Sequence, residues 1–185
     1  MFRELAILSL VIVTGCASME ITMKSPGRHE IGNSYSINTS RNWSHLSGPP
    51  ETWTIDGPAL GMLRTWAAVE DGSTLFVQGE QSLPQFRSNF SPVEVAELVA
   101  DTIENLVSGA DVEVTDFQPM AFGDNDGFRF NIEYVQNGLP NRGIAAGAIR
   151  DGKLDLLLYT APREYYFDLY APEVEGIIRS VKRSA

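Results

Sequence analysis

Residues 112–159 carry the pattern that most constrains the fold of this chain. From Phe128 to Tyr134 apolar and polar residues alternate strictly, which is the period of a strand with one buried and one polar face. The pairs Asn137-Gly138 and Asp151-Gly152 interrupt the run, and such pairs favour tight turns between antiparallel strands. The stretch therefore predicts an antiparallel meander of four strands, around Val112–Val114, Phe128–Tyr134, Gly143–Ile149 and Leu154–Tyr159.

Two helices are expected to pack on this sheet. The first should begin at Ser91, because Ser91 is a good N-cap, Pro92 suits the first helical position and Glu94 completes a capping box. Gly109 is a natural stop for it. Near the C-terminus, Pro162 and Pro172 each suit a helix start, and apolar residues from Tyr166 to Val181 recur at helical spacing. The small residues of 143–149 would let a helix pack close to the sheet.

The N-terminal half predicts shorter strands at Tyr35–Ile37, Glu51–Ile55 and Met62–Glu70. Asp71-Gly72 favours a hairpin leading into a strand over residues 73–79. Residues 16–34 contain Pro26, Gly27 and Gly32 and predict a flexible tether. The expected organisation is a signal segment at 1–15, this tether and one α+β domain at 35–185, with an antiparallel sheet of about six to seven strands flanked by helices.

The first 16 residues resemble the signal of a bacterial lipoprotein. Residues 5–13 are an apolar run too short to span a bilayer, which takes about 20 residues, and Val13-Thr14-Gly15-Cys16 follows it as a lipobox does. The resemblance implies lipid on Cys16 and cleavage after Gly15, so that the membrane is a partner through this lipid. Ala17 stands where Asp would resemble an inner-membrane retention signal, which favours the periplasmic face of the outer membrane. The alternative is an ordinary secretory signal cut near Ala17.

Composition excludes several kinds of chemistry. The formal net charge is −10, and an acidic chain of this kind repels nucleic acid. Cys16 is the only cysteine and His29 and His45 are the only histidines. With Cys16 occupied by lipid, the domain has no thiol catalysis or disulfide, and a multi-histidine zinc site is not expected. We expect no catalytic residues, no metal and no cofactor.

Three local features could still form a binding or catalytic site. Arg163, Tyr165 and Phe167 could remain exposed beside a C-terminal helix and form a binding surface for an envelope protein. Residues 123–127 could offer oxygens to calcium, although the later Glu of an EF-hand loop is missing and an Asx-rich turn explains them as well. His45 lies near Ser44 and Ser47, but no G-x-S-x-G elbow accompanies it, which argues against a hydrolase.

The order of elements resembles the PsbP/Mog-like fold, a central antiparallel sheet flanked by helices. The resemblance rests on Tyr35-Ser36-Ile37 followed by Trp43, on the helix from Ser91, on the meander and on the closing segment 177–180. It implies binding and accessory roles and no shared catalytic residues. The chain is therefore expected to be a non-enzymatic envelope lipoprotein that binds or supports a protein partner. A small-ligand or calcium-binding module and, further off, a hydrolase are the alternatives.

Overall fold

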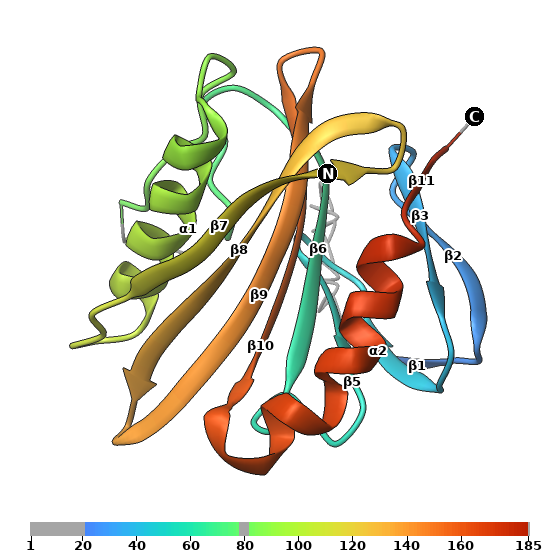
Figure 1. The fold of residues 1–185 in the computed structure, drawn as a ribbon, viewed down its shortest axis with the longest axis vertical. Coiled ribbons are helices and arrows are strands. Elements are labelled where there is room, and N and C mark those ends of the chain that lie inside the picture. Colours follow the sequence, from blue (N-terminus) through green and yellow to red (C-terminus); the bar gives the residue numbers. More distant parts are fainter. Residues whose placement is uncertain (1–20, 78–81, 185) are drawn as a thin grey trace, which may run out of the picture.

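The protein is described here by a computed structural model covering residues 21–77 and 82–184. Its main element is an eight-stranded antiparallel sheet (Figure 1). In sheet order the strands are β1 (Ile21–Lys24), β4 (Trp43–Leu46), β5 (Glu51–Thr54), β6 (Met62–Val69), β10 (Lys153–Pro162), β9 (Leu139–Arg150), β8 (Asn125–Gln136) and β7 (Glu113–Phe122). A second sheet of three strands has the order β11 (Lys182–Arg183), β3 (Tyr35–Thr39) and β2 (Gly27–Ile31).

The predicted meander is confirmed as β7 to β10. Its turns are those that the sequence favours: Asn137, Gly138, Asp151 and Gly152 all have positive φ, between 51° and 79°. Two successive residues with positive φ are the signature of the type I′ turn, whose twist matches that of the strands on either side. These hairpins fix the register of β8, β9 and β10, so the alternating residues of β8 keep one face buried throughout.

One face of the sheet is covered by α1 (Pro92–Leu106), which lies over β7 and β8 (Figure 1). The predicted cap is confirmed: the Ser91 side chain accepts from the N–H of Glu94, and the Glu94 carboxylate accepts from the N–H of Ser91 at 2.6 Å. Buried residues of α1 pack against Trp66 and the aromatic row Phe128 and Phe130. This layer forms one of the two hydrophobic clusters of the domain.

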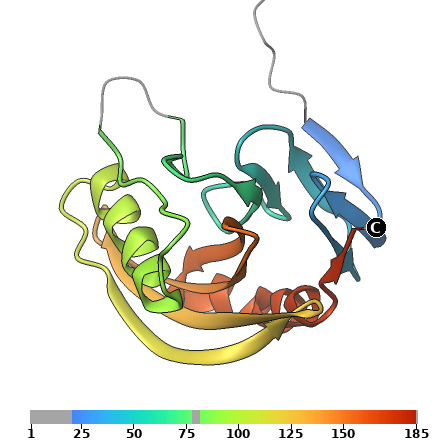
Figure 2. The same cartoon turned by 90° about the horizontal axis from the view of Figure 1, so that it is seen from above.

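The opposite face is covered by α2 (Asp168–Arg179) together with the three-stranded sheet. Seen from above, α1 and the β1 end of the curved main sheet lie on opposite sides of the molecule (Figure 2). The fold is richer in strands than predicted: the two expected α-helices are present, and a second sheet of β11, β3 and β2 packs beside α2. Within the described residues α1 and α2 are the two α-helices.

The prediction for the small residues of β9 is confirmed on one face of the sheet, where Ala146 and Ala148 pack in one cluster with Val174, Ile177 and Ile178 of α2. The glycines, on the other face, have a different role. A Cβ at Gly147 would lie 2.5 Å from the Asp155 carbonyl oxygen and 3.2 Å from the Phe128 ring, and a Cβ at Gly143 would lie 2.7 Å from Ile132. The space above these glycines is thus filled by large side chains of the neighbouring strand β8. The helix α1 packs on those side chains and not on the glycines themselves.

Three further predictions were wrong. Residues 21–34 are not an irregular tether, because β1 and β2 lie within them and pair with β4 and β3; residues 16–20 lie outside the described part of the chain. Residues 73–77 form no regular strand and make one isolated bridge, Thr74 with Gln85. Pro172 lies inside α2 and does not begin it, while Pro162 ends β10 and leads into η1 (Arg163–Phe167). Residues 21–34 form strands because distant segments pair with them, whereas Pro172 lies in a helix that already begins at Asp168.

Candidate functional site

A pocket of about 350 Å³ lies beside the C-terminal half of β6. Its walls come from the β2–β3 turn, the β4–β5 turn, β6 and the segment that follows β6. The lining is mainly apolar, with Ile31, Pro49, Pro50, Ala67, Val69 and Leu75. Glu51, Glu70, Ser73 and Thr74 add polar groups. Ligand pockets in proteins typically measure about 300–1,000 Å³ and combine an apolar lining with a few polar groups, so this pocket is large enough for a ligand.

The pocket follows an open edge of the main sheet. β5 pairs with β6 from Trp53↔Leu63 to Glu51↔Thr65, and the chain turns away before Glu51 at Gly48–Pro50. Among the described residues no strand pairs with this side of β6 beyond Thr65. The backbone of residues 66–69 therefore presents hydrogen-bonding groups toward the pocket without a strand to receive them, as an edge strand does.

A β-bulge shapes β6 where it lines the pocket. Its register with β10 shifts between Leu156↔Trp66 and Leu154↔Val69, and Ala68 has φ 50°. A non-glycine residue with positive φ is strained, and such strain persists only where surrounding groups hold it. Here the Ala68 N–H donates to Oδ1 of Asp155 at 2.8 Å, so a side chain of β10 replaces the missing ladder bond.

Asp155 connects this bulge to the second sheet. Its carboxylate is 4% exposed, accepts from the Ser34 hydroxyl at 2.7 Å and lies 3.6 Å from the Arg150 guanidinium. Arg150 also donates to Ser34 at 2.8 Å. A buried carboxylate is tolerated where several donors satisfy it. The three donors hold β6, β10 and the β2–β3 turn together around the pocket.

The remaining walls are fixed by close packing. A Cβ at Gly32 would lie 2.8 Å from the Ala67 side chain, so only glycine lets the β2–β3 turn rest directly on β6. The Trp66 indole donates to the Leu75 carbonyl and packs edge-on against Phe76, with ring centroids 5.5 Å apart. At the rim, Lys153 lies 2.8 Å from Glu70 and holds the pKa of that carboxyl below its usual value.

A second polar cluster lies at the base of β4 and β5. Trp53 packs between the His45 ring at 4.3 Å and the His29 ring at 5.3 Å. His45 lies 3.0 Å from Glu51 and 3.5 Å from the Thr22 hydroxyl. Burial between the two sheets lowers the pKa of His29. The order hydroxyl, imidazole and carboxylate resembles a catalytic triad, but the Thr22 contact is long and the imidazole side chain is only 11% exposed.

The hydrolase alternative rested on serines near His45, and the fold separates them. Side chains alternate between the faces of a strand, so Ser44 points to the opposite face of β4 from His45. The partner that sequence reasoning missed is Glu51, which arrives from the next strand. The cluster is explained by packing: it closes the end of the core where β1, β4 and β5 meet β2.

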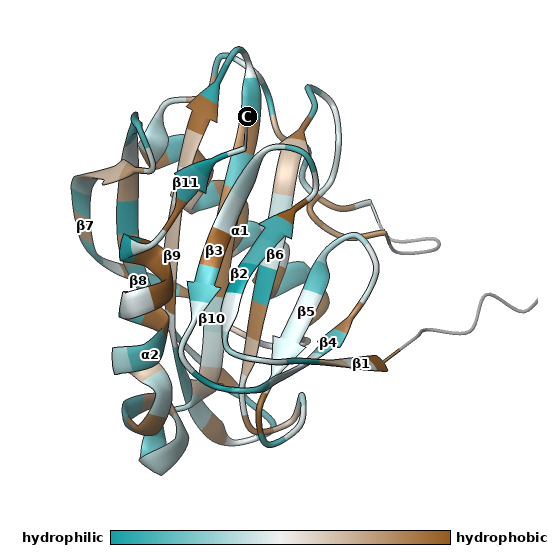
Figure 3. Ribbon diagram, turned by 90° about the vertical axis from the view of Figure 1, so that its right-hand side faces the viewer, coloured by the Kyte–Doolittle hydropathy of each residue, from teal (hydrophilic) through white to brown (hydrophobic). Residues whose placement is uncertain are grey.

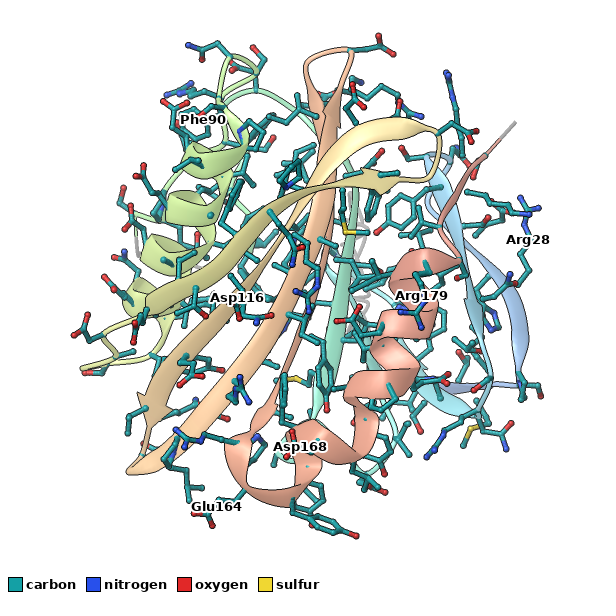
Figure 4. All side chains as sticks on the ribbon, viewed as in Figure 1. Arg28, Phe90, Asp116, Glu164, Asp168 and Arg179 are labelled. Atoms are coloured by element: carbon teal, nitrogen blue, oxygen red, sulfur yellow. The ribbon has the colours of Figure 1, made fainter. Side chains whose placement is uncertain are left out.

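The predicted binding surface is only partly assembled. Tyr165 is 69% exposed and has φ 71°, and the Arg163 side chain is 59% exposed, 3.8 Å from Glu133. Glu164 between them points into solvent at the end of the molecule (Figure 4). Phe167, however, is 7% exposed and packs under the Arg142 guanidinium at 4.9 Å. Phe167 was therefore wrongly placed outside, because it anchors η1 to the sheet; the role of Arg163 and Tyr165 stays a prediction.

The proposed calcium loop is a hairpin turn. Gly123 and Asp124 connect β7 to β8, and Asn125 already pairs with Phe122. The part of the chain that the structure describes contains no group of three or more His, Cys, Asp or Glu side chains placed to hold a metal ion. The lipidation site Cys16 lies outside the described residues. Within 21–77 and 82–184, no helix has the length and apolar character needed to span a bilayer.

The comparison of solved structures identifies the fold. The chain resembles cyanobacterial PsbP (CyanoP) from Synechocystis sp. PCC 6803, with a TM-score of 0.53 over 95% of this chain and 98% of that chain. The fold is PsbP-like. Sequence identity is only 13%, so the likeness extends to the fold alone.

The β6 pocket was not predicted from the sequence, because the free edge depends on where β5 ends in three dimensions.

A second similar structure is LpqN, described as involved in cell envelope biogenesis of Mycobacterium tuberculosis. It covers 91% of this chain and 86% of that chain at 10% identity, and its TM-score of 0.38 is too low to show a common fold. The sequence matches no protein family model, and no curated protein matches it.

Proposed function

We propose that this chain is a lipid-anchored lipoprotein of the bacterial cell envelope whose domain is a non-enzymatic accessory module. In this proposal the β6 pocket binds an extended segment of a partner protein. The observation that carries the proposal is the open edge of β6 beyond Thr65, which lies along an apolar pocket of about 350 Å³. The PsbP-like fold is compatible with such a role.

Strand addition explains why the edge and the pocket occur together. A peptide added to a sheet edge gains affinity from backbone hydrogen bonds and specificity from pockets that receive alternate side chains. The peptide would continue the line of β5 past Glu51 and place apolar side chains near Ile31 and Leu75. The bulge held by Asp155 keeps this part of β6 from pairing regularly with β10.

The anchor in the proposal rests on the lipobox ending at Cys16 and on Ala17 after it. Two or three acyl chains would hold the protein to the membrane almost permanently, since each buried CH₂ contributes about 0.8 kcal/mol. A module held in this way needs no membrane-spanning helix. The periplasmic face of the outer membrane is the proposed location.

The test is photo-crosslinking of the intact lipoprotein in its own membrane. A photoreactive amino acid at Val77, which lines the pocket and is 83% exposed, should give one dominant adduct. The same amino acid at Val93, which is 52% exposed on α1, is the matched control and should give none. In separate pull-downs without the photoreactive amino acid, Val77→Asp should abolish capture of the partner, and Val93→Asp should not. Equal amounts of photo-adduct from positions 77 and 93 would contradict the proposal.

Hydrogen exchange then separates strand addition from other modes of binding. With the captured partner present, the amides within residues 66–69 that face the pocket should exchange more slowly, because they would donate to the added strand. The Ala68 N–H, which already donates to Asp155, should not change. Unchanged exchange of the pocket-facing amides, with protection around Arg163 and Tyr165, would move the interface to the C-terminal surface.

A small apolar ligand is the second candidate for the same pocket, favoured by its volume and lining. Native mass spectrometry of the protein released gently from membranes distinguishes the two. A bound mass of a few hundred daltons that disappears in Val77→Asp would favour the ligand. If native mass spectrometry shows only the protein without added mass, and photo-crosslinking at Val77 gives a protein adduct, the peptide would be favoured.

A further inference from the structure

β1 forms one margin of the main sheet and carries two exposed apolar side chains. Ile21 is 67% exposed and Met23 is 68% exposed. They point to the same side, because Thr22 between them turns inward to His45. Their register partners on β4 are Leu46 and Ser44, which share this outer face. The start of β1 is accordingly among the brown, hydrophobic segments at the margin of the ribbon (Figure 3).

The spacing from Cys16 brings this margin close to any membrane that holds the lipid. Ile21 is five residues after Cys16, and five residues span at most about 18 Å when fully extended. The predicted tether of 16–34 would have allowed several times that reach. Because β1 begins at Ile21, lipid on Cys16 would hold this margin near the membrane surface.

The charge of the neighbouring chain differs from that of the rest of the protein. Residues 20–51 contain three basic residues, Lys24, Arg28 and Arg41, and three acidic residues, Glu20, Glu30 and Glu51, so this segment is neutral although the whole chain has a net charge of −10. Lys24 pairs in register with the buried Trp43 and so points to the opposite face of β1 from Ile21 and Met23. The Arg28 side chain projects outward from the second sheet (Figure 4) and is paired with Glu30 at 2.9 Å. A neutral margin is not repelled by the headgroups of an anionic bilayer, whereas the acidic remainder of the protein is.

We infer that the β1 margin is a second membrane contact: Ile21 and Met23 rest on the lipid bilayer that holds the anchor. The inference rests on the proposed lipid anchor and goes beyond it, because an anchor alone leaves the domain free to tumble. With β1 docked, α1 on the opposite side of the molecule faces away from the membrane (Figure 2). The domain is thereby held in one orientation.

The chain provides a matched control at another exposed apolar residue. Leu139, beside the β8–β9 turn, is 60% exposed and is far along the sequence from the anchor. Exposed apolar side chains are common on soluble proteins, so exposure alone predicts the same behaviour for Leu139 as for Met23. Only docking of the β1 margin predicts a difference between them.

The experiment uses the full acylated lipoprotein in vesicles of phosphatidylglycerol and phosphatidylethanolamine. Met23→Cys and Leu139→Cys variants are each labelled with a small fluorophore, and the quencher is a nitroxide attached to lipid. The label at position 23 should be quenched several-fold more than the label at 139. Replacing phosphatidylglycerol with phosphatidylcholine should leave the difference in place, because the contact is apolar. Equally weak quenching at both positions would overturn the inference.

The intact mass of the same samples separates this inference from the anchor. Acylated protein with an unquenched label at 23 refutes only the docking. A mass without acyl groups refutes the anchor and the docking together, while leaving the pocket proposal to its own test. Self-quenching at 23 between copies, unaffected by the lipid quencher, would mean that β1 pairs with β1 of a second molecule, and would also overturn the inference.

Discussion

At the scale of single residues, Asp155 is the side chain on which the pocket wall depends most directly. Asp155→Ala would leave the Ala68 N–H and the Ser34 hydroxyl without their acceptor inside the domain. We expect the free energy of unfolding to fall by about 3 kcal/mol, because buried groups lose their partners. Urea denaturation measures this. Asp101→Ala, on the exposed face of α1, should change it by less than about 0.5 kcal/mol.

Tyr170 gives the protein a sensitivity to alkaline pH. Its hydroxyl donates to Asp56, and this bond, with burial, raises the pKa of Tyr170 to about 12. An unfolded tyrosine titrates near pH 10, so the stabilisation is fully present below that pH and is lost as the pH rises through about 12.

The test is Tyr170→Phe, which should reduce the loss of stability between pH 10 and pH 12. Urea midpoints measured across this range give the slope. Some slope should remain, because burial also raises the pKa of Tyr35, Tyr134 and Tyr159. Tyr165→Phe, at an exposed position, should leave the slope as it is in the unmodified protein; a slope that is unchanged in Tyr170→Phe would contradict the assignment.

At the scale of elements, α1 was predictable from its own residues. Ser91, Pro92 and Glu94 specify its start by local hydrogen bonding and backbone preference, which require no distant partner. Ser91→Ala should lower the free energy of unfolding by about 1 kcal/mol. Ser108→Ala, which lies past the helix end, is the matched control and should have little effect on the thermal unfolding midpoint.

Replacing Gly147 or Gly176 by alanine should change the stability of the protein in opposite directions. At Gly147 of β9 a Cβ would meet the Asp155 carbonyl oxygen at 2.5 Å, so Gly147→Ala should destabilise by about 1–3 kcal/mol through overpacking. At Gly176 of α2 a Cβ meets nothing within 4 Å. Gly176→Ala should stabilise by about 1 kcal/mol, as expected inside a helix. Calorimetry of the two variants measures both shifts, and a common sign would contradict the packing described here.

At the scale of the whole molecule, the lipid anchor decides where the domain works. Cys16→Ser should leave the chain without acyl groups and uncleaved after Gly15, because the acyl-bearing sulfur is gone. Intact mass and membrane fractionation measure the outcome, and Ser18→Ala is the control that should be processed normally. Processing of Cys16→Ser between residues 15 and 16 would refute the lipoprotein interpretation.

The sequence by itself determined the helices and strands that are specified by residues within the element or next to it. The β7–β10 meander follows from period-two alternation and from the turn pairs at 137–138 and 151–152, and α1 follows from its cap. In both cases the signal and the structure lie within the same few residues. The PsbP-like fold could be anticipated because those elements form half of the main sheet and the helix on one of its faces.

Only the tertiary structure decided the remaining features. β1, β2 and β4 are four or five residues long, and such short strands are stable only when partners from elsewhere in the chain supply their hydrogen bonds. The pocket likewise exists because β5 ends before β6 does and because Asp155, far along the chain, holds the bulge at Ala68. Which strands pair, and how far one strand runs along its neighbour, depends on segments that are distant in the sequence. The spacing of residues within one segment therefore does not predict either.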